Sequence, residues 1–317
     1  MVFLAGIDEA GYGPFVGPFT VGFSLFRVPN LEVDLWQVLD KAATRKPSRK
    51  DRRLRVDDSK KVHSGPLGRG RLERSVAAFR ELQNPGAMDF QSWAKSAPAG
   101  PSIWLDHSPW LRNLEVPFCP SVNHDRSRLD AVSLRQCLDG GGCTLDAFGA
   151  RLVPAGEWNQ WIQKTSNKGE TLFQLTMEVV RHLLDRTGHA PLRIELDRHG
   201  GRLHYAPKLK AALQPEQIIH HGETSGGSTY TLRFADREVQ IRFSEKADST
   251  HLPVALASLA AKQSRERSMD LFNQWWLEQA PDLTGTKGYG VDGKRWLKDV
   301  EAVMPSGLNK NVLRRIR

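Results

Sequence analysis

Two adjacent carboxylates, Asp8 and Glu9, follow a short apolar run at residues 2–7. A run of this length, rich in branched side chains, is typical of a buried strand. Unpaired charge at the end of a buried strand costs several kcal/mol, so a cation is expected against it. Glycines follow at 11, 13 and 17, and they let another molecule approach the backbone closely. This pattern predicts a metal-dependent site beside a backbone-reading loop; a plain surface turn is the alternative.

Two further carboxylates stand where strands or helices are expected to end or begin. Asp197 closes the apolar run at 192–196, and Asp248 opens a long helical pattern at 247–277. Each has an ordinary alternative, since Asp is common in turns and at helix N-termini. If the strand and helix ends share one edge of a sheet, all four carboxylates converge there. His199, two residues after Asp197, is then a candidate for assisting proton transfer.

The charge of the chain favours a polyanionic partner. Lys and Arg outnumber Asp and Glu by 45 to 36, which gives a net charge of +9. The surplus is concentrated in a basic run at residues 45–53 and in a basic tail at 309–317. Either segment could serve solubility alone, but beside an acidic metal-type site they favour nucleic acid over a small-molecule substrate.

The hydrophobic pattern predicts an α/β fold with a mixed sheet, antiparallel in its first strands and parallel in its later ones, flanked by helices. Strands are expected at 2–7, 20–28, 147–153, 192–196 and 217–220, and helices at 31–44, 72–82, 170–185 and 247–277. Residues 229–234 and 238–243 alternate apolar and polar side chains and predict an extra β-hairpin within 223–243.

The segment 84–146 differs in character from the rest. It contains six prolines and a triple glycine at 140–142, so we interpret it as an irregular insertion. The chain then divides into a catalytic domain at 1–280 and a substrate-contacting segment with a basic tail at 281–317. Hydrophobic residues make up 39% of the chain, enough for a core, but no apolar stretch approaches the ~18 residues that span a bilayer.

Four ordered blocks resemble the type 2 ribonucleases H, most closely those of the HII type. They are the glycine-rich opening at 6–18, Asp-Ser-Lys-Lys at 58–61, a helix motif from Asp248 to Lys262, and Lys-Gly-Tyr-Gly at 287–290. The resemblance covers residues 1–82, 147–200 and 245–292. The insertion, the hairpin and the tail lie outside it.

The resemblance implies a ribonuclease H-like fold and specific residue roles. Asp8, Glu9, Asp197 and Asp248 correspond to the family's four metal-binding catalytic carboxylates, which implies Mg²⁺ or Mn²⁺ in a two-metal site. Substrate-contacting positions of the family correspond to the residues Gly11, Tyr12, Gly13, Lys60, Lys61 and Tyr289.

Each of these substrate positions has an implied role. The loop around Tyr12 is expected to contact the ribose 2′-hydroxyl largely through backbone groups, and the 2′-hydroxyl distinguishes RNA from DNA. Lys60 and Lys61 are expected to contact phosphates, and Tyr289 to stack on a sugar at an RNA–DNA junction. The HII type has arginine where this chain has Tyr12, which places its activity on single embedded ribonucleotides in question.

The expected function is therefore that of a metal-dependent endoribonuclease. It would hydrolyse the RNA strand of RNA–DNA hybrids, or of ribonucleotide-containing duplexes, to 5′-phosphate and 3′-hydroxyl ends. The alternatives are a related nuclease acting on another structured nucleic acid, and a non-catalytic nucleic-acid-binding protein on the same scaffold. We further expect a cytoplasmic protein with reduced cysteines, no membrane association and no obligate protein partner.

Overall fold

A seven-stranded sheet forms the centre of the molecule, with strand order β5-β2-β1-β6-β9-β8-β7. The computed structural model describes residues 1–48, 50–98 and 102–316. The strands are β1 (Val2–Ala10), β2 (Phe19–Val28), β5 (Thr144–Val153), β6 (Leu192–Asp197), β7 (Gln217–Thr224), β8 (Gly227–Arg233) and β9 (Glu238–Ser244). A separate two-stranded sheet pairs β3 (Ala43–Thr44) with β4 (Leu54–Arg55).

The pairing confirms the mixed sheet that the sequence predicts. β1 is antiparallel to β2, and β2 to β5, whereas β6 is parallel to both β1 and β9. The predicted hairpin is present as β8 and β9, and β7 extends it into a three-stranded antiparallel unit. Because β9 pairs directly with β6, this unit continues the main sheet.

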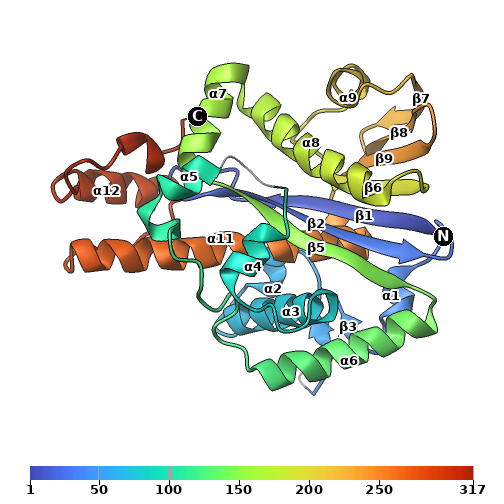
Figure 1. Ribbon diagram of the computed structural model, residues 1–317, viewed down its shortest axis with the longest axis horizontal. Helices are drawn as coiled ribbons and strands as arrows, with labels where there is room; N and C mark the ends of the chain where they lie inside the picture. Colours follow the sequence, from blue (N-terminus) through green and yellow to red (C-terminus); the bar gives the residue numbers. More distant parts are fainter. Residues whose placement is uncertain (49, 99–101, 317) are drawn as a thin grey trace.

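Helices cover both faces of the sheet (Figure 1). One face carries α7 (Ala155–Thr165), α8 (Lys168–Thr187) and α9 (Ala206–Leu213). The other face carries α3 (Gly68–Gln83), α6 (His124–Gly140), α11 (Leu252–Gln279) and α12 (Gly290–Glu301). The shorter helices are α1 (Leu35–Val38), α2 (Ser59–Val62), α4 (Phe90–Lys95), α5 (Ser102–Asp106), α10 (Ala247–Thr250) and the 3₁₀ turns η1 (Pro109–Leu111) and η2 (Lys310–Val312).

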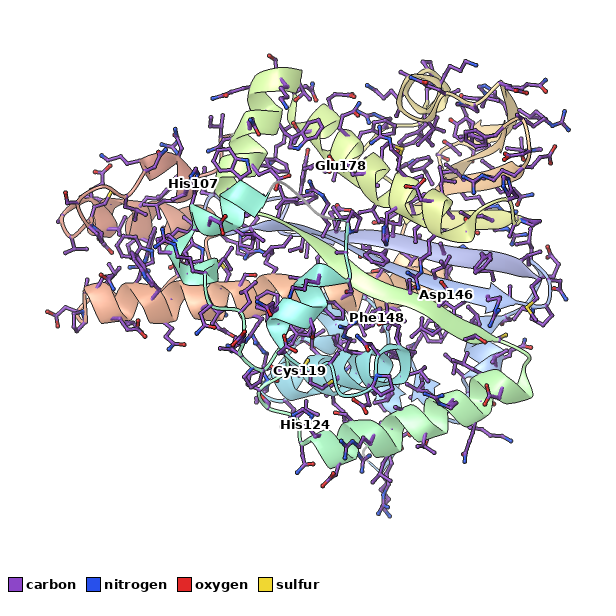
Figure 2. All side chains as sticks on the ribbon, in the orientation of Figure 1. His107, Cys119, His124, Asp146, Phe148 and Glu178 are labelled. Atoms are coloured by element: carbon purple, nitrogen blue, oxygen red, sulfur yellow. The ribbon has the colours of Figure 1, made fainter. Side chains whose placement is uncertain are left out.

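A buried ion triad joins the sheet to the layer of α7 and α8. Arg151 on β5 lies 2.5 Å from Glu157 on α7 and 2.7 Å from Glu178 on α8. Figure 2 shows Glu178 in this layer and Cys119 in the opposite one. Cys119, Cys137 and Cys143 are all free thiols. Within the described residues, no helix is both long and apolar enough to cross a membrane.

The segment 84–146 is less irregular than its prolines predict. Its first part contains only short helices and turns, but α6 forms 17 residues of regular helix after the last proline. Asn123 caps this helix by accepting a hydrogen bond from the Asp125 N–H at 2.8 Å. Leu134 and Leu138 are buried on one of its sides. The irregular structure predicted for 84–146 is therefore wrong for α6, where an N-cap and an apolar stripe stabilise a regular helix.

The predicted helix at 31–44 is also wrong, because only the four residues of α1 are helical. The chain turns after Val38, so that Ala43 and Thr44 pair with β4. The Arg53 guanidinium donates to the Asp40 carbonyl at 2.8 Å, which occupies a group that a continuing helix would use itself. These are long-range contacts that local hydrophobic pattern does not encode.

Helix α11 lies directly against the backbone of β2. Along β2, Thr20, Gly22 and Ser24 alternate onto the face that α11 covers, as the two-residue period of a strand requires. The Thr20 hydroxyl donates to the Ala261 carbonyl at 2.9 Å, and the Ser24 hydroxyl donates to the Pro253 carbonyl at 2.8 Å. Short polar side chains and glycine thus permit an unusually close approach of helix and sheet.

On β1 the same approach depends on Gly6. A Cβ atom at Gly6 would lie 2.1 Å from the Pro253 carbonyl carbon and 2.2 Å from the Val254 nitrogen, both backbone atoms at the start of α11. We expect Gly6→Ala to lower the free energy of unfolding by about 3 kcal/mol or more, because neither backbone can move aside cheaply. Chemical denaturation measures the loss.

Gly70→Ala is the matched control for this prediction. Gly70 lies on α3 with nothing within 4 Å of the added methyl group. This variant should be as stable as the wild type or about 0.5–1 kcal/mol more stable, because alanine favours a helix over glycine. Equal stability of Gly6→Ala and Gly70→Ala would contradict the close packing of α11 on β1.

Candidate active site

Asp8 and Glu9 end strand β1 on opposite faces of the sheet. Gly6 and Asp8 face α11, where the Ser258 hydroxyl donates a hydrogen bond to the Asp8 carboxylate. Glu9 is turned toward the layer of α7 and α8. The Asp8 carboxylate also accepts the Glu9 N–H at 2.8 Å. The strand end therefore presents one carboxylate to each side of a single edge.

Strand β6 brings Asp197 to the same edge. The parallel register pairs Ile7 with Leu196, so Asp197 follows at the level of Asp8. One oxygen of Asp197 accepts the Ala247 N–H at 3.1 Å. This bond ties the start of α10 to the end of β6, and Asp248 is the next residue of α10. The strand ends predicted to share one edge do so.

Electrostatics link the four carboxylates to one another. Burial raises the pKa of Asp8 well above its usual value, and the charges of Glu9 and Asp197 raise it further. Burial and Asp197 raise the pKa of Glu9 to about 7. Burial likewise raises the pKa of Asp197 and of Asp248, with Asp58 and Asp197 adding to the second. Each of Asp8, Glu9 and Asp248 thus experiences the charge of Asp197.

The carboxylates are close enough to repel, yet they do not form a closed ligand set. Across residues 1–48, 50–98 and 102–316, no three His, Cys, Asp or Glu side chains are grouped closely enough to hold a metal ion. The donor chemistry nevertheless fits a hard divalent cation, since every member is a carboxylate oxygen donor. A cation site without its bound cation also leaves partly buried acids close together, and their pKa values are then raised.

The loop at residues 11–18 follows directly after β1. Gly11 and Gly17 both have φ of 84°, in the left-handed region that favours glycine. A Cβ at Gly13, by contrast, would have nothing within 4 Å, so the backbone there is open to an approaching molecule. The loop therefore combines two conformationally fixed glycines with one accessible position between them.

The Tyr12 side chain points toward the layer of α7 and α8. Its ring meets Trp158 edge-on at 6.3 Å between centroids, and the Lys168 ammonium lies 4.3 Å from its ring centre. Burial and the Glu9 charge raise the pKa of the Tyr12 hydroxyl, while Arg202 lowers it. Although Tyr12 carries no charge itself, Lys168 and Arg202 thus provide positive charge at this position.

The Asp-Ser-Lys-Lys block forms α2 and adjoins the carboxylates. The Ser258 hydroxyl that holds Asp8 also lies 3.0 Å from the Ser59 hydroxyl and accepts the Ser59 N–H at 3.4 Å. Lys60 lowers the pKa values of Glu9 and Asp197, which places its positive charge beside both. Lys61 is exposed and pairs with Asp57 at 3.1 Å.

Part of the basic run reaches the same edge. The Arg45 guanidinium donates to the Ser249 carbonyl at 2.7 Å, one residue after Asp248. Arg45, Lys46, Arg53 and Lys61 all line an open pocket of about 490 Å³ with Ser249. Arg49 of this run lies outside the described residues. The positive charge predicted at 45–53 therefore adjoins the carboxylates in three dimensions.

Tyr289 lies on the far side of loop 11–18, 43% exposed, with the Arg265 guanidinium 5.1 Å from its ring centre. The neighbouring Gly288 carbonyl accepts the Phe15 N–H at 2.8 Å, which joins the tyrosine block to the loop. A partly exposed aromatic ring thus stands beside loop 11–18.

Several residues of this region have no distinct sequence signal. Asp58 is a fifth acid, and its charge raises the pKa of Asp248. It is also the N-cap of α2, and this ordinary role gives no sign in the sequence of a position near the other acids. Ser258 lies within the Asp248–Lys262 motif but looks like any small residue of a buried helix, since residues 252–261 are all buried. Its contact with Asp8 is identified only by the packing of α11 on β1.

His199 does not take the role expected from its position. Its ring lies in a buried aromatic cluster with Phe173, Tyr205 and Phe243. Burial lowers its pKa to about 3, so the imidazole is neutral at physiological pH. The residues after Asp197 fold back into the core, because the Tyr205 hydroxyl accepts the His199 N–H at 3.0 Å.

Solved ribonuclease H structures are similar to the chain over nearly its whole length. The ribonuclease H2 of Pyrococcus horikoshii OT3 has a TM-score of 0.47 and 16% identity, covering 98% of this chain and 92% of that one. The RNase HII of Archaeoglobus fulgidus, in a complex with PCNA, has a TM-score of 0.42 and 15% identity, covering 99% and 94%. Bst-RNase HIII in complex with Mn²⁺ has a TM-score of 0.43 and 13% identity, covering 99% and 66%.

No family model and no curated protein matches the chain.

The raised pKa of Glu9 predicts that stability falls as pH rises. Folded Glu9 keeps its proton up to about pH 7, whereas the unfolded side chain loses it near the ordinary value of 4.5. Between these values the folded state binds more protons, so the free energy of unfolding decreases with rising pH. Asp8, Asp197 and Asp248 act in the same direction.

Glu9→Gln should restore part of the stability that the protein loses as pH rises. Because Glu9 is only half-buried, solvent screens the repulsion, and we expect a gain of about 1–2 kcal/mol at pH 8 and none at pH 4. Thermal unfolding in the presence of a chelator measures it, with the exposed Glu216→Gln as the control. A Glu9→Gln variant no more stable than wild type at pH 8 would contradict the repulsion described here.

Proposed function

We propose that this protein is a metal-dependent endoribonuclease that hydrolyses the RNA strand of RNA–DNA hybrids to 5′-phosphate and 3′-hydroxyl ends. One observation carries the proposal: Asp197 on β6 repels the carboxylates of Asp8 and Glu9 on β1 and of Asp248 on α10, at one sheet edge beside an open glycine loop. Such acids are costly to keep together without a cationic partner, and a fold has no structural use for them.

Asp8, Glu9, Asp197 and Asp248 would hold Mg²⁺ or Mn²⁺. When bound, a pair of such ions supplies an activated water and stabilises the leaving 3′ oxygen of a phosphodiester. The fit rests on the donor set, which is all carboxylate, and on the raised pKa values of all four groups.

The surrounding residues keep this site ready for a cation. Lys60 favours the ionised forms of Glu9 and Asp197, since its charge lowers both pKa values. Backbone N–H groups of Ala247 and Arg198 do the same for Asp197. Ser258 fixes Asp8 by a hydrogen bond to its carboxylate. These contacts orient the acids before any substrate arrives.

The substrate class follows from the flanking surfaces. The pocket lined by Arg45, Lys46 and Lys61 offers positive charge to a phosphate backbone on the Asp248 side. On the other side, the open backbone at Gly13 and the ring of Tyr289 are suited to a sugar rather than to a base edge. Backbone contact with a sugar can sense the 2′-hydroxyl that distinguishes RNA from DNA.

Purified protein with Mg²⁺ or Mn²⁺ should cut the RNA strand of a labelled hybrid and leave the DNA strand intact. Asp8→Asn and Asp248→Asn should each lower the rate by about 1000-fold or more, because each removes a charged ligand. Asp139→Asn, on the exposed side of α6, is the control with the same chemical change. Wild-type rates in Asp8→Asn, or cleavage that persists in chelator, would overturn the proposal.

Tyr12 leads to a second prediction, which concerns how the cleavage rate depends on the length of the RNA tract. Tyrosine offers one hydroxyl and a ring, without the forked donors of arginine. We expect hybrids with several ribonucleotides to be cut faster than a DNA duplex with a single embedded ribonucleotide, which depends more on each contact. Tyr12→Arg should raise the single-ribonucleotide rate selectively, whereas Tyr12→Phe should not. A wild-type preference for the single ribonucleotide, or no effect of Tyr12→Arg, would contradict this account of the loop.

A further inference from the structure

Two buried arginines lie beneath loop 11–18, and neither has a carboxylate partner among the residues that the structure describes. Arg265 on α11 is 1% exposed and Arg315 is 2% exposed. No salt bridge of either guanidinium is found in the described part of the chain. In both, the Nε and Nη1 atoms are buried and lack hydrogen-bond partners. Burial, and then the charge of Arg265, lower the pKa of Arg315 to about 9.

This arrangement is expensive, and packing alone does not explain it. A buried unpaired charge costs several kcal/mol, and an apolar side chain of similar volume avoids that cost. The nearby Arg151 illustrates the usual solution, since two glutamates neutralise it. Arg265 and Arg315 therefore serve something other than core stability.

Their remaining nitrogen atoms hold the carbonyl groups of the loop. The Arg315 Nη2 atom donates to the Gly11 carbonyl and, at 2.7 Å, to the Pro14 carbonyl. The Arg265 Nη2 atom donates to the Lys287 carbonyl at 2.9 Å and to the Val16 carbonyl at 3.4 Å. The carbonyl oxygens of this loop are thus drawn inward by two cations.

An inward carbonyl fixes the direction of the N–H in the same peptide group. The described part of the chain contains no cis peptide bond, and in a trans peptide the C=O and N–H point to opposite sides. Because the Gly11 carbonyl faces Arg315, the N–H of Tyr12 faces away from the core. Neither the Tyr12 nor the Gly13 N–H has a hydrogen-bond partner among the described residues. The Tyr12 N–H is consequently presented at the open position of the loop, next in sequence to the Gly13 N–H.

The segment that carries Arg315 is itself fixed by α7. The Asn159 side chain donates to the Arg314 carbonyl at 2.8 Å and accepts the Ile316 N–H at 2.7 Å. The Trp158 ring N–H donates to the Ile316 carbonyl at 3.0 Å, and the Arg315 guanidinium lies 5.1 Å from the Trp158 ring centre. Residues 314–316 are therefore held on one side by α7 and on the other by loop 11–18.

We infer that Arg315 and Arg265 are positioning residues for substrate recognition. Arg315 orients the Tyr12 N–H toward a ribonucleotide, and Arg265 fixes the far end of the loop through the Val16 and Lys287 carbonyls. Both place positive charge behind the phosphate of that ribonucleotide. The inference rests on the proposed nuclease function. It makes Arg315, which lies outside all the motifs of the sequence, part of the specificity site. Their charge acts across one thin layer of loop backbone, where low dielectric preserves it.

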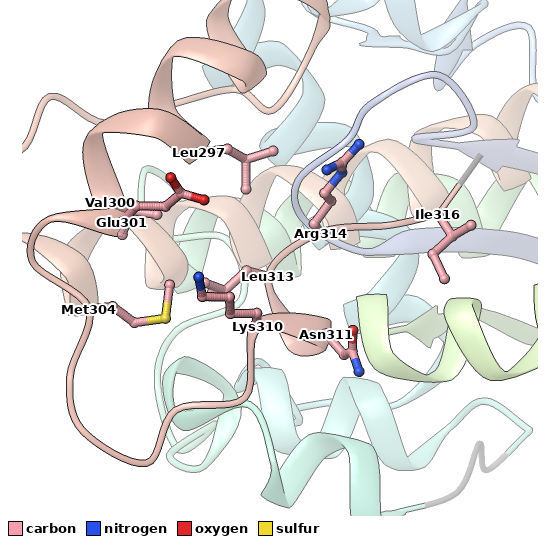
Figure 3. A pocket seen from close by; sticks show the side chains of 9 residues that line it. All are labelled: Leu297, Val300, Glu301, Met304, Lys310, Asn311, Leu313, Arg314 and Ile316. Carbon is pink, nitrogen blue, oxygen red and sulfur yellow. The ribbon is translucent and has the colours of Figure 1, made fainter.

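Arg315→Ala and Arg314→Ala form the test pair. Both remove one arginine from the same segment, but Arg314 is exposed and lines a pocket of about 390 Å³ beside α12 (Figure 3). For Arg315→Ala we expect kcat/KM on hybrid to fall by roughly 10- to 100-fold, as for loss of a charged hydrogen-bonding group. The affinity ratio of hybrid to DNA duplex, measured by fluorescence anisotropy with Ca²⁺, should fall by roughly 10-fold. Arg314→Ala should change neither.

Three further measurements separate positioning from general damage. The rise in unfolding temperature on adding Mn²⁺ should be the same in Arg315→Ala and wild type, because the carboxylates are untouched. Arg315→Lys keeps the charge but loses the fork that reaches two carbonyls, so its activity should be intermediate. Asn159→Ala leaves the arginine in place and should lower the same affinity ratio by releasing the segment. If Arg315→Ala does not fold, the results for Arg315→Lys and Asn159→Ala test the positioning role of Arg315 without it.

The outcomes distinguish this inference from the proposed function. If the wild type does not cut hybrids at all, the proposed function fails. If the wild type cuts hybrids and Arg315→Ala keeps the wild-type affinity ratio, or loses no more than Arg314→Ala, the positioning role is overturned. A loss of Mn²⁺ stabilisation in a folded Arg315→Ala would also overturn it, since the effect would then extend to the carboxylates.

Discussion

The structure depends on the close contact between helix α11 and the backbones of β1 and β2. Glycine at positions 6 and 22 removes the side chains that would separate them: a Cβ at Gly22 would lie 2.0 Å from the Ala257 carbonyl oxygen. This contact brings Ser258 within hydrogen-bond distance of Asp8. Farther along α11, Arg265 reaches the loop that follows β1. A wider spacing would disconnect both the carboxylates and the loop from the helix that orients them.

The same region concentrates charge of both signs, at a cost that the rest of the fold has to offset. Four carboxylates with raised pKa values share one edge. Under the adjoining loop lie two guanidinium groups that bind carbonyl groups and have no carboxylate partner among the described residues. The carboxylates suit a cation site at the reacting phosphate of the proposed reaction. The guanidinium groups provide positive charge near the neighbouring phosphate. Arg151, by contrast, is neutralised by two glutamates. Conflict between local stability and charge is typical of functional sites.

The sequence predicts those parts of this picture that depend on local pattern. Apolar runs reveal β1 and β6, so the strand-end positions of Asp8 and Asp197 follow directly. Features that depend on distant residues are not predictable in this way. The helix expected at 31–44 fails because Arg53 takes a carbonyl of the turn, and α6 forms in a segment that its prolines made look irregular. Arg315 looks like part of a basic tail, and only its contact with Gly11, across some three hundred residues of sequence, reveals its burial.

The central claim is that Asp8, Glu9, Asp197 and Asp248 together bind a divalent cation. Anomalous diffraction from a crystal soaked in Mn²⁺ tests it most directly, because the method locates the metal without reference to activity. We predict one or two anomalous peaks coordinated by oxygen atoms of these four side chains, lost in a crystal of Asp8→Asn. Anomalous peaks that lie only elsewhere in the molecule, or no peak at saturating Mn²⁺, would contradict the account.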